Sequence, residues 1–471
     1  RAIRDVYKRQ PLRDNSLAGS PIRPLWHASE RRIAALFPDT TTSTELSLHN
    51  LPTFPKIPHT PRNPVPGATT LCSMIRPDLS SLPAYVPGTS QPGALKLASN
   101  ESSLSPLPSV SAVINDATSN LNRYPDMASG ALRGKLAQWL GVNLDNVAVG
   151  NGSSALCQQL VQATCKDGDE VVYAWQSFEA YPILCKIAGA VGVGVPLKRG
   201  RHDLKAMSEA IGERTRLVFV CNPNNPTGTT VSRDEFREFM GRVPEDVTVV
   251  LDEAYVEYNR DAESPVALEE LQRYPNLAVC RTFSKAYGLA GLRLGYLVGP
   301  EGLVEAVNKV GIPFGVNALA QAAGVASVDA QAELAARVDA TVVERERVEA
   351  YLAGVAPAGA GSAGAAGGAA DGAEGSEPLT YPSQANFVWL NAGERAEALD
   401  EALKREGVVA RCFAGEGVRV TVTTAEETDV LLRALDRALP AVGLAGVGVQ
   451  GADVDAINRA TSADQASPQA D

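Results

Sequence analysis

The sequence predicts an α/β protein with a larger domain around a mostly parallel central sheet and a smaller α+β domain. Between about residues 123 and 330, short apolar runs rich in β-branched residues alternate with segments of helical periodicity. Runs that are apolar at every position fit strands buried on both faces, as in parallel sheets covered by helices. After residue 330, a long amphipathic pattern is followed by shorter strand-like runs, which indicates a second, smaller domain.

Five segments follow from this pattern. We expect a disordered extension, an N-terminal arm with part of the smaller domain, the larger domain, the smaller domain with an Ala/Gly-rich flexible loop at 354–378, and a disordered tail; their ranges are 1–73, 74–122, 123–330, 331–440 and 441–471. Repeated proline without hydrophobic periodicity argues against packed structure in the first segment. Its residues 5–10 resemble a translated sequencing adapter, so two origins are open: an artefact, or a genuine disordered extension.

Individual strands and helices can be expected at defined places. The candidate strands of the larger domain are 147–149, 170–173, 217–220, 247–251 and 277–280. A short helix is expected within 75–122, and a long amphipathic helix over 330–352. In the smaller domain, residues 384–390 and 408–422 have the pattern of strands.

The charge of the chain excludes some partners. Its 471 residues include 43 Lys and Arg against 54 Asp and Glu, a net charge of -11. Such an acidic protein repels phosphate backbones and anionic lipid, so we expect neither nucleic acid nor a membrane surface as a partner. The sequence lacks a run of about 18 apolar residues, so no transmembrane helix is expected.

Cysteine and histidine usage bears on the redox state of the thiols and on two further kinds of site. The seven cysteines are scattered without a CxxC pair, which favours reduced thiols in a cytoplasmic protein. Three of the four histidines lie in the expected extension, and His202 stands alone. We therefore expect neither a metal site built on histidine nor a Ser-His-Asp triad, because both need a suitably placed histidine.

Three successive candidate strands each run into a polar cluster. Asn225 belongs to the cluster after 217–220, Asp252 follows 247–251 directly, and Lys285 comes shortly after 277–280. Ligands of open α/β sheets bind at the carboxyl ends of the strands. The three clusters therefore predict one shared site.

The residue types in these clusters suit an aldehyde cofactor with a pyridine ring and a phosphate group. A buried lysine can form a Schiff base with the aldehyde, and a carboxylate such as Asp252 can keep the ring nitrogen protonated. The phosphate needs hydroxyl groups, backbone amides at a helix N-terminus and an arginine. The lysine segment and the glycine-rich stretch 150–154 offer Thr282, Ser284, Arg293, Gly152 and Ser153.

The lysine segment resembles a known family. Residues 284–295, SKAYGLAGLRLG, look like the lysine segment of class I and II aminotransferases and, more narrowly, of the histidinol-phosphate aminotransferase subfamily. Further matching stretches are KLASNE (96–101), NRYPD (122–126), NPNNPTG (222–228), DEAY (252–255), QANFVWL (384–390) and GVRVT (417–421). The resemblance covers about residues 75–440. It implies the fold type I of pyridoxal-phosphate transferases, with pyridoxal 5'-phosphate as the cofactor.

The resemblance also implies a role for each residue at the cofactor ring. Lys285 would hold the cofactor and act as the general base, and Asp252 would pair with the ring nitrogen. Asn225 and Tyr255 would hydrogen-bond the phenolic oxygen of the ring, and Phe178 would stack on its face. The phosphate would be bound by the amides of Gly152 and Ser153 and by the side chains of Thr282, Ser284 and Arg293.

Residues for the substrate and for a second subunit are implied in the same way. Tyr124 would reach the phosphate in the neighbouring subunit, which implies a homodimer with shared active sites. Arg419 would bind the substrate α-carboxylate in a bidentate pair. Tyr85 and Arg411 would face the far end of the substrate.

Four of these residues also have a plain structural interpretation. Asp252 could cap the following turn, and Phe178 could belong to the core. Arg411 could be a solvated surface residue, and Tyr124, which precedes a proline, could sit in a packed turn.

Two substrate classes compete within the subfamily. Residues 85–88, 92–101 and 156–162 resemble actinobacterial aromatic aminotransferases, which favours phenylalanine and tyrosine as amino donors and 2-oxoglutarate as acceptor. The alternative donor is histidinol phosphate, in histidine biosynthesis. A non-catalytic pyridoxal-phosphate sensor is a remote alternative, because such regulators carry a helix-turn-helix pattern that residues 1–73 lack. Decarboxylases and acyl-transferring synthases of the same fold lack support from the motifs.

Overall fold

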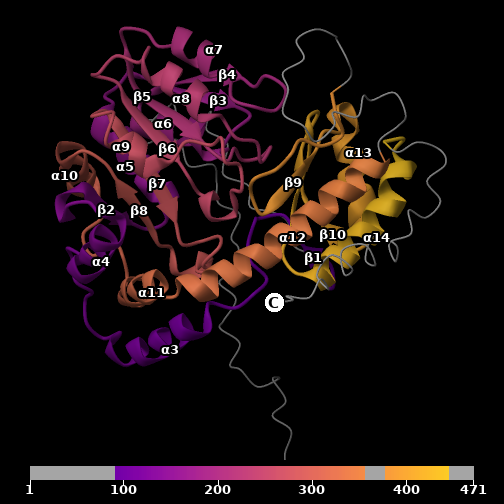
Figure 1. Ribbon diagram of the computed structural model, residues 1–471, viewed down its shortest axis with the longest axis horizontal. Helices are drawn as coiled ribbons and strands as arrows, with labels where there is room; N and C mark the ends of the chain where they lie inside the picture. The colour runs from indigo at the N-terminus through magenta and orange to yellow at the C-terminus, as the bar shows by residue number, and fades with distance from the viewer. Residues whose placement is uncertain (1–90, 356–376, 445–471) are drawn as a thin grey trace, which may run out of the picture. The chain divides into compact units, whose positions relative to one another are not determined.

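The computed structural model describes residues 91–355 and 377–444 (Figure 1). All of them belong to one compact unit, Thr69–Asp471. The expectations for the extension 1–73, for Tyr85, for most of the loop 354–378 and for most of the tail 441–471 lie outside the described residues.

A seven-stranded sheet, here called the large sheet, has the strand order β2-β8-β7-β6-β5-β3-β4. Its strands are β2 (Val147–Gly150), β3 (Glu170–Trp175), β4 (Val191–Pro196), β5 (Thr215–Cys221), β6 (Thr248–Asp252), β7 (Leu277–Thr282) and β8 (Gly295–Val298). Strands β4, β3, β5, β6 and β7 pair in parallel, and β8 is antiparallel to both β7 and β2. The predicted mostly parallel sheet is confirmed, and each of the five candidate runs overlaps an observed strand.

Helices cover both faces of the large sheet. Alternate residues of β5 point to opposite sides: Leu217 and Phe219 pack with helices α5, α6 and α10, while Val218 and Val220 pack with α7, α8 and α9. These helices are α5 (Ser153–Thr164), α6 (Ala180–Ala188), α10 (Glu301–Val310), α7 (Leu204–Glu209), α8 (Arg233–Met240) and α9 (Ala267–Leu271). Burying each large apolar side chain contributes about 1.5–3 kcal/mol, so uninterrupted apolar runs form the central strands.

A third helical layer lies beside the β2–β8 end of the large sheet (Figure 1). It consists of α3 (Pro108–Ala117), α4 (Gly130–Leu140) and α11 (Ala318–Asp329), which share one core through Val110, Leu132 and Ala320. The expected short helix within 75–122 is α3. The described 3-10 turns are η3 (Thr118–Asn120), η4 (Leu144–Asn146), η5 (Val256–Tyr258), η6 (Ala290–Leu292) and η7 (Gly393–Arg395).

A three-stranded antiparallel sheet, here called the small sheet, has the order β11-β12-β9. Its strands are β9 (Phe387–Leu390), β11 (Arg411–Phe413) and β12 (Gly417–Thr421), and it packs with α13 (Ala396–Arg405) and α14 (Ala425–Ala441). Beside it, β1 (Leu95–Lys96) pairs in parallel with β10 (Val408–Val409). Both strand regions expected after residue 380 are therefore present.

Helix α12 (Gln331–Val355) belongs to two cores (Figure 1). Leu334 and Val338 in its first half pack with the helical layer of α4 and α11, whereas Leu352 and Val355 pack with the small-sheet core. The long helix expected over 330–352 is confirmed and continues to Val355, into the range expected to be a loop. Where a domain boundary falls along it stays a prediction.

Two findings on the described residues concern membrane spans and metal sites. None of the helices described is long and apolar enough to cross a lipid bilayer. Within 91–355 and 377–444, no group of His, Cys, Asp and Glu side chains is arranged to hold a metal ion.

Candidate active site

The three predicted strand-end residues come together because their strands are neighbours. Strand β6 lies between β5 and β7 with all three parallel, so Asp252, the last residue of β6, is flanked by the segments that carry Asn225 and Lys285. Each polar side chain follows a strand that is buried on both faces. The sheet thus supplies a rigid base for the site.

Asp252 is a buried carboxylate whose two oxygens differ in their hydrogen bonding. Its Oδ2 accepts a hydrogen bond from the Tyr181 hydroxyl at 2.7 Å and lies 3.9 Å from the Cys157 Sγ. Its Oδ1 has no hydrogen-bond partner among the described residues. Burial raises the pKa of Asp252 to about 6, because the charged form loses its hydration. A buried acceptor without a donor indicates a place for a ligand N–H group.

Lys285 faces the same site from the segment after β7. Its Nζ donates to the Ser99 carbonyl at 3.0 Å and lies 5.8 Å from the centre of the Tyr255 ring. Desolvation, and to a smaller extent the nearby positive charge of Arg419, lower the pKa of Lys285 to about 7. A lysine with this pKa is partly neutral at physiological pH, as a nucleophilic amine requires.

Tyr255, Asn225 and Arg419 line the site on the side of the small sheet. The Tyr255 hydroxyl accepts a hydrogen bond from Asn100 Nδ2 at 2.9 Å. Arg419, in β12, donates to the Asn225 side-chain oxygen and, at 2.8 Å, to the Ala98 carbonyl. These contacts join the small sheet to the loop after β5 and bring the three residues together.

Asn100 is a site residue to which sequence reasoning assigned no role. Its backbone has φ +53°, a left-handed conformation that asparagine tolerates better than most residues. The Thr421 hydroxyl accepts its backbone N–H at 2.9 Å, and its carbonyl accepts from Asn386 at 3.3 Å. The available signal was its place in the matching stretch 96–101, but the residue that it contacts lies 155 positions away.

A second group of residues forms a cradle at the N-terminus of α5. Arg293 Nη1 lies 3.3 Å from the Ser284 Oγ, and its Nη2 lies 3.4 Å from the Ser154 Oγ. Thr282 donates to Ser284 at 3.0 Å. The cradle combines hydroxyls, a guanidinium and the backbone N–H groups at the start of α5, which is the chemistry of a phosphate site. The predicted Gly152 amide is an exception, because its N–H donates to the Gly150 carbonyl at 2.8 Å.

Gly152 is required for the shape of this cradle. It has φ +82°, and a Cβ there would lie 2.5 Å from Arg293 Nη2. On the other side, a Cβ at Gly295 would lie 2.4 Å from the Ser153 backbone nitrogen. The predicted residues Gly152, Ser153, Thr282, Ser284 and Arg293 are therefore assembled at one place, and Ser154 joins them.

Phe178, Arg411 and Tyr124 lie in three different surroundings. Phe178 is half-buried and packs edge-on against Tyr181, with ring centres 5.4 Å apart. Arg411 forms an ion pair of 2.7 Å with Glu179, and its side chain is 17% exposed, so it is not a fully solvated surface residue. Tyr124 is 84% exposed, and its ring centre lies 4.9 Å from that of Phe314.

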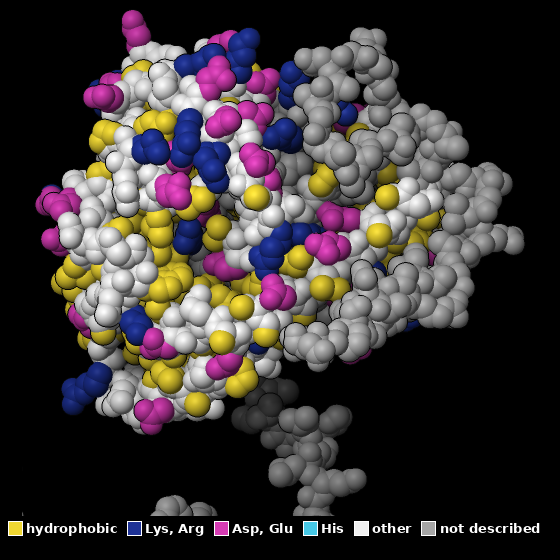
Figure 2. Space-filling view, in the orientation of Figure 1, with side chains coloured by type: hydrophobic (Ala, Val, Ile, Leu, Met, Phe, Trp, Pro, Cys, Tyr) yellow, Lys and Arg dark blue, Asp and Glu magenta, His cyan; other side chains and the backbone are white. Residues whose placement is uncertain are grey.

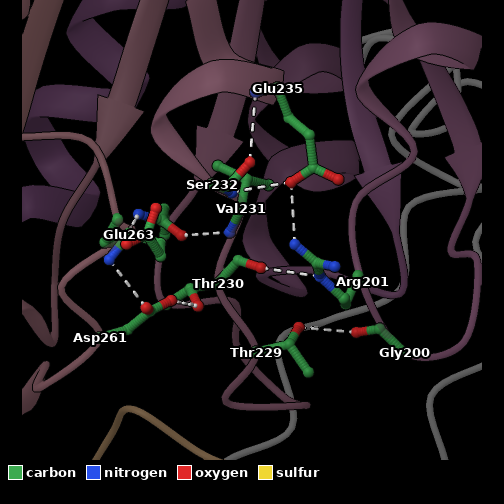
Figure 3. Close-up of polar contacts among 11 residues, drawn as sticks. Gly200, Arg201, Thr229, Thr230, Val231, Ser232, Glu235, Asp261 and Glu263 are labelled. Carbon is green, nitrogen blue, oxygen red and sulfur yellow. Dashed lines mark hydrogen bonds and ion pairs between the residues drawn. The ribbon is translucent and has the colours of Figure 1, made fainter. Parts of the chain in front are cut away.

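The segment after the Asn225 loop is fixed by a network of polar contacts (Figure 3). Thr229 donates to the Gly200 carbonyl at 2.8 Å, and Thr230 donates to Asp261 at 2.6 Å. Arg201 donates to the Thr230 carbonyl at 2.9 Å and forms an ion pair with Glu235 at 2.8 Å. The loop that presents Asn225 is thus anchored to its neighbours at its far end.

The sequence of the chain is similar to those of known aminotransferases. The profile of the family described as aminotransferase class I and II matches residues 92–435. An aromatic amino acid aminotransferase of Corynebacterium jeikeium (strain K411) is 88% identical over 398 residues, covering 84% of this chain and 100% of that relative. Another, of Corynebacterium glutamicum (strain R), is 52% identical over 362 residues, covering 77% of this chain and 98% of that relative.

A solved structure shows the same fold. The histidinol-phosphate aminotransferase from Sinorhizobium meliloti, crystallised in complex with pyridoxal-5'-phosphate, is 29% identical with a TM-score of 0.67. The match covers 79% of this chain and 97% of that chain.

Proposed function

The chain belongs to the class I and II aminotransferase family, and from this premise we propose that it transfers the amino group of phenylalanine and tyrosine to 2-oxoglutarate, giving an arylpyruvate and glutamate. The family assignment confirms the fold type predicted from the sequence. The observation that carries the transamination is the buried Asp252 oxygen without a partner among the described residues, on the strand next to the one that leads to Lys285.

The described residues fit pyridoxal 5'-phosphate. The free Oδ1 of Asp252 suits the N–H of a pyridinium ring, the cradle around Arg293 suits the phosphate, and Lys285 suits covalent attachment. When bound, the cofactor supplies an electron sink for charge that develops at the substrate α-carbon. The Tyr255 hydroxyl and Asn225 would hydrogen-bond the ring oxygen, and Phe178 would pack on the ring.

Lys285 and Asp252 would carry the proton chemistry. Lys285 Nζ would take the proton from the substrate α-carbon and return it, a step favoured by a pKa near the operating pH. Asp252 would stay ionised when a positively charged N–H donates to it, since an opposite charge lowers the pKa of a buried carboxylate. Its charge in turn keeps that proton in place.

Arg419 would bind the α-carboxylate that both substrates carry. It is buried, and its guanidinium is already oriented by Asn225 and by the Ala98 carbonyl. Because the amino donor and the 2-oxo acid use the site in turn, one arginine can serve both. A planar guanidinium suits a carboxylate in a bidentate pair.

A homodimer with shared active sites is supported by an exposed apolar surface. Tyr124 contacts Phe314, and Leu121, Met127 and Ile312, which are near them in the sequence, are exposed hydrophobic side chains as well. Figure 2 shows hydrophobic side chains gathered on the part of this face where α4 and α11 lie in Figure 1. Contiguous exposed apolar surface marks protein interfaces. Such a dimer would place Tyr124 at its partner's phosphate cradle.

The free thiols of the described residues support a cytoplasmic location. Cysteines in the described ranges are all free rather than paired, as expected where the medium is reducing.

The aromatic donor has more support than histidinol phosphate. The relative that is 88% identical is named for aromatic amino acids, whereas the likeness to a histidinol-phosphate enzyme rests on 29% identity. The test is a panel of donors with 2-oxoglutarate, scored by kcat/KM and by glutamate formed. We expect phenylalanine and tyrosine to exceed histidinol phosphate. A higher kcat/KM for histidinol phosphate would overturn the aromatic assignment, and release of CO2 without glutamate would overturn transamination.

A further inference from the structure

Two arginines stand side by side on one face of the small sheet. Arg411 in β11 and Arg419 in β12 are directly opposite in the antiparallel register, which places their Cβ atoms about 5 Å apart on the same face. Both guanidinium groups also approach the Phe413 ring, at 5.8 and 6.0 Å from its centre. If Arg419 binds the α-carboxylate, Arg411 lies beside the rest of the substrate.

Arg411 differs from its neighbour in having a carboxylate partner. Its Nη2 lies 2.7 Å from the Glu179 Oε1, and the two side chains are only 17% and 29% exposed. Glu179 comes from the other wall of the site, at the start of α6 and next to Phe178, the residue proposed to pack on the cofactor ring. The positive charge of Arg411 is therefore balanced from within the protein.

We propose that Glu179 is a specificity-determining residue that disfavours donors with a phosphate group and so favours uncharged aromatic rings. The proposal rests on the proposed function, because it assumes that Arg411 faces the far end of the donor. A phosphate approaching Arg411 meets the Glu179 carboxylate, and like charges at short distance in a partly buried site repel strongly. Specificity of this kind comes from a repulsive element rather than from a new attractive contact.

The surroundings of Arg411 suit an uncharged ring. Phe413 packs against Trp389, with ring centres 5.3 Å apart. Trp389 is opposite Arg419 in the β9–β12 register and so lies on the same face. Both rings are buried, at 4% and 8% exposure, so with Arg411 neutralised the side chains around it are aromatic and carry little net charge beyond that of Arg419.

A neighbouring contact supplies a matched control. Gln176, in the same segment as Glu179, donates to the Glu416 carboxylate at the turn between β11 and β12. Glu416→Gln therefore removes one negative charge from the same pair of segments but leaves the partner of Arg411 in place. Glu179→Gln removes the charge on Arg411's partner while keeping an oxygen that can accept its hydrogen bond.

The experiment compares wild-type holoenzyme with Glu179→Gln, Glu179→Asp and Glu416→Gln. For each, kcat and KM are measured with phenylalanine and with histidinol phosphate, together with the inhibition constant of phenyl phosphate against whichever donor is turned over. In Glu179→Gln we expect the kcat/KM ratio of histidinol phosphate to phenylalanine to rise roughly tenfold or more, mainly through KM. Phenyl phosphate should bind more tightly by a similar factor.

The controls separate charge from structure. Glu179→Asp should restore the wild-type ratio, and Glu416→Gln should leave it unchanged. An unchanged ratio in Glu179→Gln, or an equal rise in Glu416→Gln, would overturn the proposal. If Glu179→Gln does not fold, the double variant Arg411→Gln with Glu179→Gln, which removes both charges of the pair, must bind phenyl phosphate roughly tenfold more tightly than Arg411→Gln alone; equal affinities would overturn the proposal. A further outcome is that the wild type does not turn over phenylalanine, while phenyl phosphate still binds more tightly to Glu179→Gln than to the wild type. In that case the aromatic assignment fails, and the repulsion of phosphate by Glu179 stands.

Discussion

Burial shifts the two central ionisable groups in opposite directions. The pKa of Lys285 falls from 10.5 to about 7, and that of Asp252 rises from 3.8 to about 6. Each shift has desolvation as its largest cause, because water stabilises a charge better than the protein interior does. In the ligand-free protein both charged forms are therefore costly, and bound ligands of opposite charge would relieve that cost.

Asp252→Asn should stabilise the ligand-free protein at alkaline pH while it lowers activity. In the wild-type folded state, the Asp252 carboxyl keeps its proton up to about pH 6. In the unfolded state, this carboxyl releases its proton at about pH 4. Folding stability is therefore lost as pH rises through that window, by roughly 3 kcal/mol at about 1.4 kcal/mol per unit. Asparagine avoids this loss and still accepts the Tyr181 hydrogen bond. Urea unfolding at pH 8 should show the gain, and at pH 4.5 a smaller one.

The same change should lower kcat/KM of the holoenzyme by roughly 30-fold to several thousand-fold, since losing one partner of a buried charge pair costs about 2–5 kcal/mol. Glu253→Gln is a contrast of opposite sign. Burial raises the pKa of Glu253 as well, but this carboxylate forms an ion pair of 2.7 Å with the mostly buried Arg281. Removing its charge leaves that arginine unpaired and should destabilise the protein. A less stable Asp252→Asn protein at pH 8, or one with near-normal rates, would contradict the account.

Arg419→Ala should weaken both half-reactions. With phenylalanine as donor and 2-oxoglutarate as acceptor, each substrate loses its carboxylate partner, and kcat/KM should fall by roughly 30-fold to several thousand-fold in each. Single-turnover measurements of the two half-reactions separate the effects. A donor half-reaction that is unaffected would mean that Arg419 does not bind the amino acid carboxylate.

At the scale of single elements, the sequence predicted best what local patterns determine. Strands β5, β6 and β7 each contain an uninterrupted apolar run, 217–221, 249–251 and 277–280, because both faces of these runs are buried. They could therefore be recognised along with the polar clusters that follow them. Edge strand β4 was missed, since its glycines at 192 and 194 weaken the strand pattern and most of its residues are exposed. Strand β8 was also missed, although β2, which has the same length, was predicted.

Contacts between distant segments could not be predicted in this way. The hydrogen bond from Asn100 to Tyr255 and the ion pair from Glu179 to Arg411 join residues 155 and 232 positions apart. Neither has a local sequence pattern, because each partner is brought in by a different element. The roles of Lys285 and Arg293 were suggested by residue type and position and made specific by the resemblance, and the structure adds the contacts that they make.

Gly152→Ala should damage the cradle at the start of α5. The new Cβ would lie 2.5 Å from the Arg293 guanidinium, in a backbone with φ +82°, so the arginine must move away from Ser154 and Ser284. We expect pyridoxal 5'-phosphate affinity, measured by equilibrium dialysis, to fall by at least tenfold. Gly168→Ala is the matched control, since φ is +80° there but the space around it is open. Equal losses in both variants would show that backbone strain alone is responsible.

At the scale of the whole molecule, one helix connects the parts that form the site. Because α12 is continuous and packs into two cores, it joins the large sheet, which carries Asp252 and Lys285, to the small sheet, which carries Arg419. The hydrogen bond from Arg419 to Asn225 then joins the two sheets at the site itself. Substrate binding to Arg419 would act on both sheets together.

The exposed surface around Tyr124 and Phe314 should hold a dimer together. Ile312 is 75% exposed there, and Ile312→Asp would place a charge in the interface. Light scattering should show a dimer for the wild type and an increased monomer fraction for the variant, with loss of bound cofactor if the sites are shared. Val191→Asp, at an exposed position on β4, should stay dimeric. A monomeric wild type with full activity would exclude shared sites.

The most direct test follows the state of Lys285 through one catalytic cycle. Borohydride is added to the holoenzyme, and the peptide containing residue 285 is examined by mass spectrometry. We predict that the cofactor mass is found on Lys285 in the resting enzyme, is lost when phenylalanine is added before borohydride, and returns when 2-oxoglutarate follows. Lys285→Ala should show no such mass. Attachment at another lysine, or attachment to Lys285 that phenylalanine does not release, would contradict the account.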